Sequence, residues 1–301
     1  PEAVLNVKAH MRIRTILLQG SSVKSLTFLG DMFDGVQCPC ILLQLIATGK
    51  PLSTAGMIIE DRTRTYTIAM ERTVVPENFS FRMTDEEYRV LEKIKNSIPV
   101  CYLADHADFA LGIVTGNNKK FLSAEKTENS EMVLKGTDIC KYHINPAKQY
   151  LRFEPEQFQQ VAPLEIYRAP EKLLYRFISN QLVVAYDDRQ MLSLNSCNIV
   201  IPKIEGMQIK YILAILNSSV SQFVYQKEFH SIKVLRAHME HIPIPRVGKA
   251  IQNEIIAMTE PLICGMGKEA AETCQKRLDC RIMDLFRLSA EEQWIIRHAL
   301  H

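Results

Sequence analysis

The chain has 301 residues, of which 47% are hydrophobic and 23% are charged, and its 36 Lys and Arg nearly balance its 34 Asp and Glu. This composition is that of a globular protein and excludes collagen-like, fibrous and disordered chains. The length is typical of two domains, or of one large domain with an appendage. No apolar run reaches the roughly 20 residues that cross a bilayer, so we expect no membrane partner.

Cysteine usage indicates a reducing compartment. The eight cysteines include no Cys-x-x-Cys pair, which argues against a zinc site and against a disulfide framework. Scattered thiols in a chain of this size are typical of the cytoplasm, where we expect the protein to be located. The chain opens at Pro1 without an initiator methionine or a signal peptide, and we expect it to be a piece of a longer protein.

Charge is distributed unevenly along the chain. Residues 181–250 carry 8 basic and 5 acidic side chains, whereas residues 251–301 carry 6 and 8. Proteins that bind nucleic acid concentrate Lys and Arg on one face. The basic excess therefore favours residues 181–250 as the place of such a face.

The beginning of the chain predicts a part of an α/β sheet. Apolar residues recur near helical spacing from Ala3 to Leu18, and Val23–Phe28 is a strand candidate. The continuous apolar run Cys40–Ile46 is typical of a strand inside a sheet that is covered on both faces. One helix and two strands cannot cover such a sheet, so its other strands are expected from residues outside this chain.

A short charged helix is predicted at the end of this first domain, over Asp85–Ser97. Thr84 is its expected N-cap, and Glu87 completes a capping box. Pro99 ends the helix, so we place the boundary of the first domain at residues 1–98.

Residues 99–245 predict a strand-rich second domain, and residues 246–301 predict terminal helices. A helix is expected over Gln208–Tyr225, where apolar residues recur on one face, and a capping box of Ser289 and Glu292 is expected to start the last helix. The fold class is therefore mixed α and β (α+β). The expected strands of the second domain are Leu111–Val114, Gln149–Phe153, Leu173–Ser179, Leu182–Tyr186 and Asn198–Ile201.

Motifs of catalysis are absent from the sequence. It contains no Gly-rich loop for a methyl donor, no Asn/Asp-Pro-Pro-Tyr/Phe loop, and no acidic residue two positions before any of its 19 lysines. His238 and His241 could face one metal on a helix, but no third ligand is evident, and solvated or DNA-facing histidines explain the pair better. We therefore expect no catalytic residue, no metal and no cofactor in this chain.

Two basic stretches are candidates for binding phosphate or nucleic acid. Leu111–Phe121 predicts a strand followed by a turn that offers small residues, amides and two adjacent lysines. Tyr225–Arg236 follows the predicted helix and mixes cations with hydroxyl and amide groups. A solvated hairpin and a solvated helix flank are the alternatives for the two stretches.

The order of motifs resembles the C-terminal part of adenine-specific DNA methyltransferases of the TaqI-like kind, including the fused type II restriction-modification enzymes. The first 85 residues resemble the end of the methyltransferase domain, a Rossmann-like sheet, and the Gly112–Phe121 turn resembles the opening of the target recognition domain. The further landmarks, in the order of the family, are Leu134–Asp138, Leu173–Phe177, Ala185–Asp187, Ala214–Ser218, His241–Pro245, Leu278–Asp279 and Leu285–Glu292.

This resemblance implies that residues 99–245 are a target recognition domain that binds double-stranded DNA with sequence specificity. The donor-binding and catalytic halves of the family are missing, so the resemblance implies S-adenosylmethionine and methyl transfer for the parent protein only. It also implies a catalytic methyltransferase domain as partner, in the same or a separate chain.

The DNA-binding candidates follow from charge, loop position and this order of motifs. Phosphate contacts are expected in and after the Gly112–Phe121 turn, and base contacts in the Tyr225–Arg236 stretch. The candidates are Thr115, Gly116, Asn117, Lys119, Lys120, Lys135 and Lys141 for the first group, and Lys227, His230, Ser231, Lys233 and Arg236 for the second.

Two other classes of function stay open. The chain could be part of an active enzyme, either a methyltransferase whose catalytic half is a separate chain or a nuclease of unrecognised type. It could also be a protein-interaction or specificity subunit whose terminal helices dock on a separate modification subunit.

Overall fold

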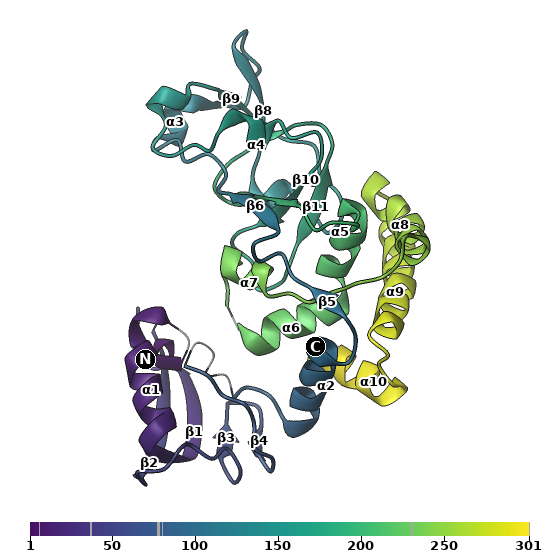
Figure 1. Ribbon diagram of the computed structural model, residues 1–301. Helices are drawn as coiled ribbons and strands as arrows, with labels where there is room; N and C mark the ends of the chain where they lie inside the picture. The colour runs from purple at the N-terminus through teal and green to yellow at the C-terminus, as the bar shows by residue number, and fades with distance from the viewer. Residues whose placement is uncertain (6, 37, 77–78, 80, 230, 301) are drawn as a thin grey trace. The chain divides into compact units, whose positions relative to one another are not determined.

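The computed structural model describes residues 1–5, 7–36, 38–76, 79, 81–229 and 231–300. The chain divides into two compact units (Figure 1): unit 1 comprises Pro1–Leu91 and Lys227–Phe229, and unit 2 comprises the rest. The mixed α and β fold class predicted from the sequence is confirmed.

Unit 1 is built around a four-stranded sheet with the order β2-β1-β3-β4. Strand β1 pairs antiparallel with β2 and parallel with β3, and β4 is antiparallel to β3. The apolar core of the unit includes Leu26, Phe28, Met57 and Phe79. The elements are η1 (Glu2–Leu5), η2 (Lys8–His10), α1 (Met11–Gly20), β1 (Ser21–Asp31), β2 (Pro39–Ala47), β3 (Ile58–Glu60) and β4 (Thr65–Thr67).

One sequence prediction for unit 1 is wrong, and a second concerns a sheet whose other strands were expected from outside this chain. The expected helix begins only at Met11, because the buried Arg14 guanidinium donates hydrogen bonds to the carbonyls of Val4 (2.8 Å) and Val7 (2.9 Å) and holds the preceding chain in two 3-10 turns. The apolar run in β2 lies at the edge of the sheet rather than inside it. Its side chains Leu42 and Ile46 are 60% and 45% exposed.

Helix α2 (Asp85–Asn96) confirms the expected helix and its capping box. The Thr84 N–H donates to Glu87 Oε2 (2.8 Å), and the Glu87 N–H donates to Thr84 Oγ1 (3.2 Å). Two donors at the helix start are thereby satisfied within the motif.

The described residues of unit 2 form three small sheets, with the orders β11-β10-β13-β6, β12-β8-β9-β7 and β14-β5. The predicted strands at β9, β10, β11 and β13 are confirmed. Residues 111–114 instead form isolated bridges from Ile113 to Leu194 and from Val114 to Gln160. The strands are β5 (Val100–Cys101), β6 (Ala107–Ala110), β7 (Leu122–Ser123), β8 (Ser130–Leu134), β9 (Gln149–Arg152), β10 (Lys172–Arg176), β11 (Val184–Asp187), β12 (Leu192–Ser193), β13 (Cys197–Pro202) and β14 (Ile244–Pro245).

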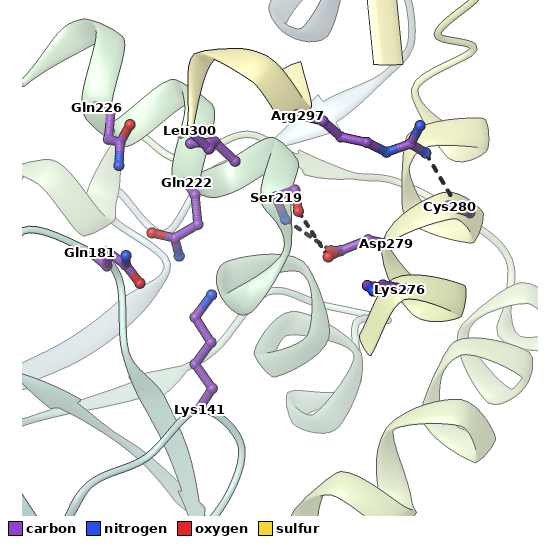
Figure 2. Close-up of a pocket in the computed structure, with 10 residues that line it drawn as sticks. All are labelled: Lys141, Gln181, Ser219, Gln222, Gln226, Lys276, Asp279, Cys280, Arg297 and Leu300. Atoms are coloured by element: carbon purple, nitrogen blue, oxygen red, sulfur yellow. Dashed lines mark hydrogen bonds between the residues drawn. The ribbon is translucent and has the colours of Figure 1, made fainter. Parts of the chain in front are cut away.

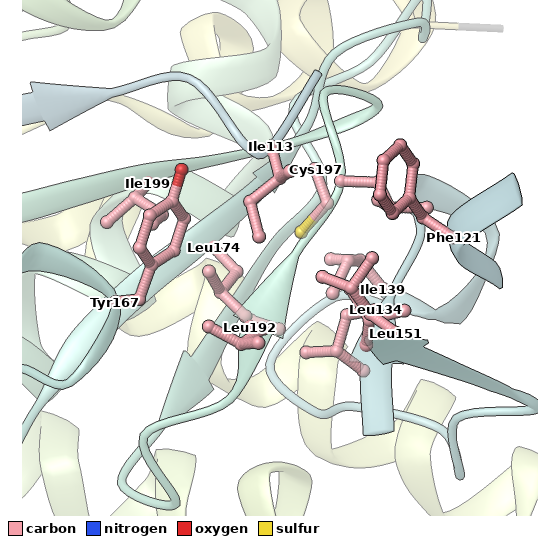
Figure 3. Packing of buried hydrophobic residues seen from close by; sticks show 13 residues of the cluster. Ile113, Phe121, Leu134, Ile139, Leu151, Tyr167, Leu174, Leu192, Cys197 and Ile199 are labelled. Atoms are coloured by element: carbon pink, nitrogen blue, oxygen red, sulfur yellow. The ribbon is translucent and has the colours of Figure 1, made fainter. Parts of the chain in front are cut away.

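One apolar core joins the two larger sheets of unit 2. Figure 3 shows Leu174 and Ile199 from one sheet, Leu134 and Leu151 from the other, and Phe121 beside them. The backbone approaches closely at the entry to this core, where a Cβ on Gly112 would lie 2.1 Å from the carbonyl oxygen of Leu194. Only glycine fits at that position.

The predicted helix over Gln208–Tyr225 is two helices, α5 (Ile209–Asn217) and α6 (Ser219–Glu228). The helix is interrupted at Ser218, whose backbone is extended and whose hydroxyl donates to the Ile215 carbonyl. Asp279 then caps the start of α6 by accepting from the Ser219 N–H (2.9 Å) and hydroxyl (2.8 Å). This cap comes from a distant part of the chain, so local spacing gave no sign of the break.

Amide side chains from these helices cover the edge of the β11 strand. Asn217 donates to the Val184 carbonyl (2.8 Å) and accepts from the Val184 N–H (3.1 Å). Gln222 makes the same pair of bonds to Leu182. The buried backbone groups of an edge strand are thereby satisfied without another strand.

The remaining helices of unit 2 include two longer ones near the C-terminal end, over Lys249–Cys264 and Lys268–Leu285, which contact each other. Ser289 and Glu292 form the predicted capping box at the start of α10. No helix in the part of the chain that the structure describes is both long enough and apolar enough to cross a membrane. The helices are α3 (Asn118–Phe121), η3 (Gly136–Asp138), η4 (Pro155–Gln157), α4 (Leu164–Tyr167), α7 (Arg236–Glu240), α8 (Lys249–Cys264), α9 (Lys268–Leu285) and α10 (Ala290–Ala299).

Candidate nucleic-acid interface

The loop before α3 holds the first group of candidate residues on a fixed turn. Gly116 has a φ of +75°, and the Asn117 side chain caps α3 by accepting from the Lys120 N–H (3.3 Å). Phe121 is buried in the apolar core and anchors the end of the turn. The buried Thr115 donates its hydroxyl to Asn118 Oδ1 (2.6 Å), so this hydroxyl supports the loop from inside.

Two lysines that lie far apart in the sequence line one hollow in unit 2. Lys119 is exposed on α3, and Lys135 is half-buried before η3, and both line a hollow of about 340 Å³ together with Asn118 and Gln149. Lys120 points its ammonium to Gln157 Oε1 (2.7 Å) and lies over the Phe121 ring. Ammonium groups and an amide around one hollow are suited to the oxygens of a phosphate.

The second group of candidates lies in the loop before α7. The Ser231 hydroxyl donates to the Lys233 carbonyl (3.0 Å) and accepts from the Lys233 N–H (3.1 Å), and the Lys233 side chain is exposed. Arg236 begins α7, pairs with Glu240 (2.7 Å), and keeps 60% of its side chain exposed. His230 lies outside the described residues. The exposed Lys233 and Arg236 are the cations that this loop offers to a ligand.

Arg236 lines a hollow of about 660 Å³ with residues that the sequence did not single out. Asp108, Gln160 and Tyr175 share this hollow, and Arg236 lies over the Phe109 ring at 5.1 Å. Arginine recognises guanine, a carboxylate accepts from cytosine, and glutamine pairs with adenine in the major groove. Asp108 and Gln160 carried no sequence signal because only the fold brings them beside Arg236.

Tyr225 and His238 hold the loop of Ser231 and Lys233 in place. Tyr225 donates its hydroxyl to the Ser231 carbonyl (2.9 Å), and its ring contacts the His238 ring. His238 Nδ1 accepts from the Leu235 N–H (3.2 Å), and the ring also bonds the backbone of Lys233. Burial lowers the pKa of His238 to about 4, which keeps its imidazole neutral and Nδ1 free to accept.

We expect the His238 imidazole to make the stability of unit 2 dependent on pH. The unfolded chain protonates this group near pH 6.5 and the folded chain near pH 4, so stability is lost as pH falls between these values. The loss is on the order of 2 kcal/mol once solvent screening is allowed for. Urea unfolding at pH 7 and pH 4.5 measures it.

The matched control for this effect replaces a histidine that lies elsewhere in unit 2. His238→Asn keeps an acceptor for the Leu235 N–H and should flatten the loss of stability toward acid pH, whereas replacement of the exposed His106 by Asn tests for general effects of removing an imidazole. An unchanged acid slope in His238→Asn would contradict the assignment.

Lys141 and Lys227 lie in neither of these two hollows. Lys227 pairs with Glu87 (2.8 Å) and is 9% exposed, and burial lowers its pKa. Lys141 is mostly buried and donates to the Asn217 carbonyl (3.3 Å), and burial lowers its pKa as well. Their contact with DNA stays a prediction to which the geometry adds nothing.

Within the described ranges, no three His, Cys, Asp or Glu side chains are grouped so that they could hold a metal ion. His238 faces its own loop, and His241 Nδ1 lies 2.6 Å from the Ala237 carbonyl oxygen. The Nδ1 atoms of both histidines are therefore engaged with the backbone of their own segment. What the two hollows offer is hydrogen bonding and charge.

Residues 131–244 match the family model of the TaqI-like C-terminal specificity domain. This match confirms the resemblance predicted from the sequence. The matched segment includes Lys135, which lines one hollow, and the loop before Arg236. No curated protein matches the chain.

Solved structures show similarity to the fold. The chain is similar to the Type IIL restriction-modification enzyme MmeI, solved in complex with DNA, with a TM-score of 0.59 and 10% identity over 99% of this chain and 48% of that chain. It also matches the type IIG restriction endonuclease BpuSI, with a TM-score of 0.44 and 10% identity over 100% of this chain and 45% of that one. The HsdS subunit from Thermoanaerobacter tengcongensis matches with a TM-score of 0.37 and 14% identity, over 72% of this chain and 50% of that one. The chain thus spans about half the length of these proteins.

Proposed function

We propose that this chain, whose residues 131–244 form a TaqI-like C-terminal specificity domain, is the sequence-specific DNA-recognition part of a restriction-modification enzyme. The match of that segment is the observation that carries the proposal. The fold shared with MmeI agrees with it.

In this proposal the two groups of candidate residues have different roles. Lys119, Lys120 and Lys135 contact backbone phosphates and set the register, with the Gly116–Asn117 turn offering backbone amides. Ser231, Lys233 and Arg236 contact base edges, and His230 stays a sequence-based candidate for the same task. Lys233 and Arg236 are the exposed cations proposed to contact base edges.

A catalytic methyltransferase domain is the proposed protein partner. The apolar side chains Leu42 and Ile46 of the edge strand β2 are 60% and 45% exposed. An exposed edge strand with apolar side chains is suited to further pairing and packing. S-adenosylmethionine would belong to that partner, because this chain has neither the Gly-rich loop nor the catalytic loop that would hold it.

The same exposed edge keeps the alternative of a specificity subunit open, in which a separate modification subunit covers unit 1. Under either form the protein acts in the cytoplasm, and its eight free thiols agree with a reducing compartment. The two forms differ in whether the partner is covalently continuous with this chain.

Selection from a random duplex library tests the proposal. We expect the purified chain to enrich one sequence motif and to bind it at least about 10³-fold more tightly than a scrambled duplex at physiological salt. Arg236→Met should relax preference at one base position, by roughly 1–3 kcal/mol of discrimination. Binding without any enriched motif would contradict the proposal, and stable association with a methyltransferase in the absence of DNA affinity would favour a pure interaction module.

A further inference from the structure

A third hollow of unit 2, of about 550 Å³, is lined by cations and amides from α6, α9, α10 and two loops (Figure 2). Its volume lies within the range of small-molecule sites. Figure 2 shows Lys141 reaching from its loop toward Gln222. The polar lining consists of the cations Lys141, Lys276 and Arg297, the carboxylate Asp279, and the amides Gln181, Gln222 and Gln226.

The cations of this hollow are not matched by carboxylates. Asp279 directs both oxygens to Ser219 at the start of α6, where a negative charge stabilises the helix. Arg297 contacts the Cys280 sulfur and the Gln293 amide oxygen. In the part of the chain that the structure describes, none of the three cations forms an ion pair.

Lys141 is the most buried of these cations. Its ammonium donates one long hydrogen bond, to the Asn217 carbonyl (3.3 Å). A partly buried ammonium with one long hydrogen bond among the described residues is poorly compensated for the water it has lost. Burial lowers the pKa of Lys141 even though the nearby Asp279 carboxylate opposes this shift. An anion in the hollow would supply the missing acceptors.

We propose that this hollow binds a small phosphate-bearing molecule, up to the size of a nucleotide. Two ammonium groups and a guanidinium around one hollow match the charge and the several acceptor oxygens of a phosphate. Among the described residues, the side-chain amides of Gln181 and Gln226 take part in no hydrogen bond, so they are available to the rest of the ligand. A DNA duplex carries the same phosphate chemistry, so the test below compares free phosphate with a duplex. The inference does not rest on the proposed DNA recognition.

Calorimetric titration with inorganic phosphate and with adenosine monophosphate, at constant ionic strength balanced with chloride, tests the site. Wild-type protein should bind one phosphate per chain. Replacement of Lys141, Lys276 or Arg297 by Met should weaken binding by roughly 10- to 100-fold, the effect of one charged hydrogen bond. Lys148→Met, which changes an exposed lysine outside the hollow, is the matched control and should bind like the wild type.

Each outcome decides the proposal. Equal binding by all variants, or no saturable binding, would show an adventitious ion only and would overturn it. If Lys141→Met instead weakens duplex binding and reduces the salt dependence while free phosphate does not saturate, the lysine serves the DNA backbone and the small-ligand site is wrong. Because Lys276 and Arg297 are exposed, their variants give a result even if Lys141→Met does not fold, which circular dichroism shows.

Discussion

Removal of the Asp187 carboxylate should destabilise unit 2 by about 3–5 kcal/mol, the usual cost of leaving one member of a buried ion pair alone. Asp187 Oδ2 lies 2.5 Å from Lys172 Nζ, and both side chains are fully buried. The Lys172 ammonium also donates to the Tyr167 carbonyl (2.6 Å), and Asp187 accepts from the backbone N–H groups of Arg189 and Met191. One carboxylate therefore holds the ammonium and the turn that follows β11.

Charge pairing, rather than loss of the turn bonds, should account for most of this effect. Burial lowers the pKa of Lys172 and Asp187 opposes the shift, so without the carboxylate the ammonium must lose its proton or remain buried and unpaired. Urea unfolding of Asp187→Ala at pH 7 measures the loss. A loss under about 1 kcal/mol would contradict the assigned role.

Two further variants separate the causes of the destabilisation. Asp188→Ala removes the adjacent, exposed carboxylate and should change stability by no more than about 0.5 kcal/mol. The double replacement Lys172→Met with Asp187→Leu removes both charges and should recover much of the lost stability. Failure to recover would assign the effect to the turn after β11.

The sequence predicted those elements whose stabilising contacts are local. The capping boxes at Thr84 and Ser289 formed as expected, because both partners of each hydrogen bond lie within one helical turn. The break at Ser218 was missed because its cap, Asp279, is 60 residues from Ser219. Long-range hydrogen bonds of this kind leave no periodic trace in a sequence.

Burial was the second property that the sequence could not decide. The run in β2 has the composition of an interior strand, yet the described part of unit 1 leaves much of it exposed at a sheet edge. Composition reports what a segment is suited to contact, and not whether the contact lies within the same chain. The exposed edge strand β2 is therefore proposed as a docking surface for the methyltransferase domain.

The sequence identified the loops that hold the candidate residues, but not which of these residues share a surface in the fold. Lys119 and Lys120 were selected because they follow a turn, and the structure adds that Lys119 shares a hollow with Lys135, 16 positions later. Asp108 and Gln160 beside Arg236 were absent from the sequence-based set, since a strand, a loop and a helix from distant parts of the chain bring them together. Charge runs identified cations, while hydrogen-bonding partners for base edges depended on the fold.

Reversing Lys119 and Lys135 to Glu should weaken DNA binding by about 10- to 100-fold at 0.1 M salt, because each phosphate contact contributes about 0.9 to the slope of log K against log salt. The two lysines line one hollow, so both are expected to contact the same stretch of backbone. The loss should be equal for the selected and the scrambled duplex, since phosphates carry no sequence information. Fluorescence anisotropy over a salt series measures affinity and slope together.

The control for this reversal carries the same change of net charge elsewhere in unit 2. Lys126 and Lys148 are exposed and lie outside the Lys119 hollow and the Arg236 hollow. Replacing both by Glu should therefore reduce DNA affinity much less and leave the salt slope nearly unchanged. Equal losses in the two double variants would mean that overall charge, and not the hollow, attracts DNA. A loss confined to the selected duplex would instead mean that Lys119 and Lys135 contact base edges and not phosphates.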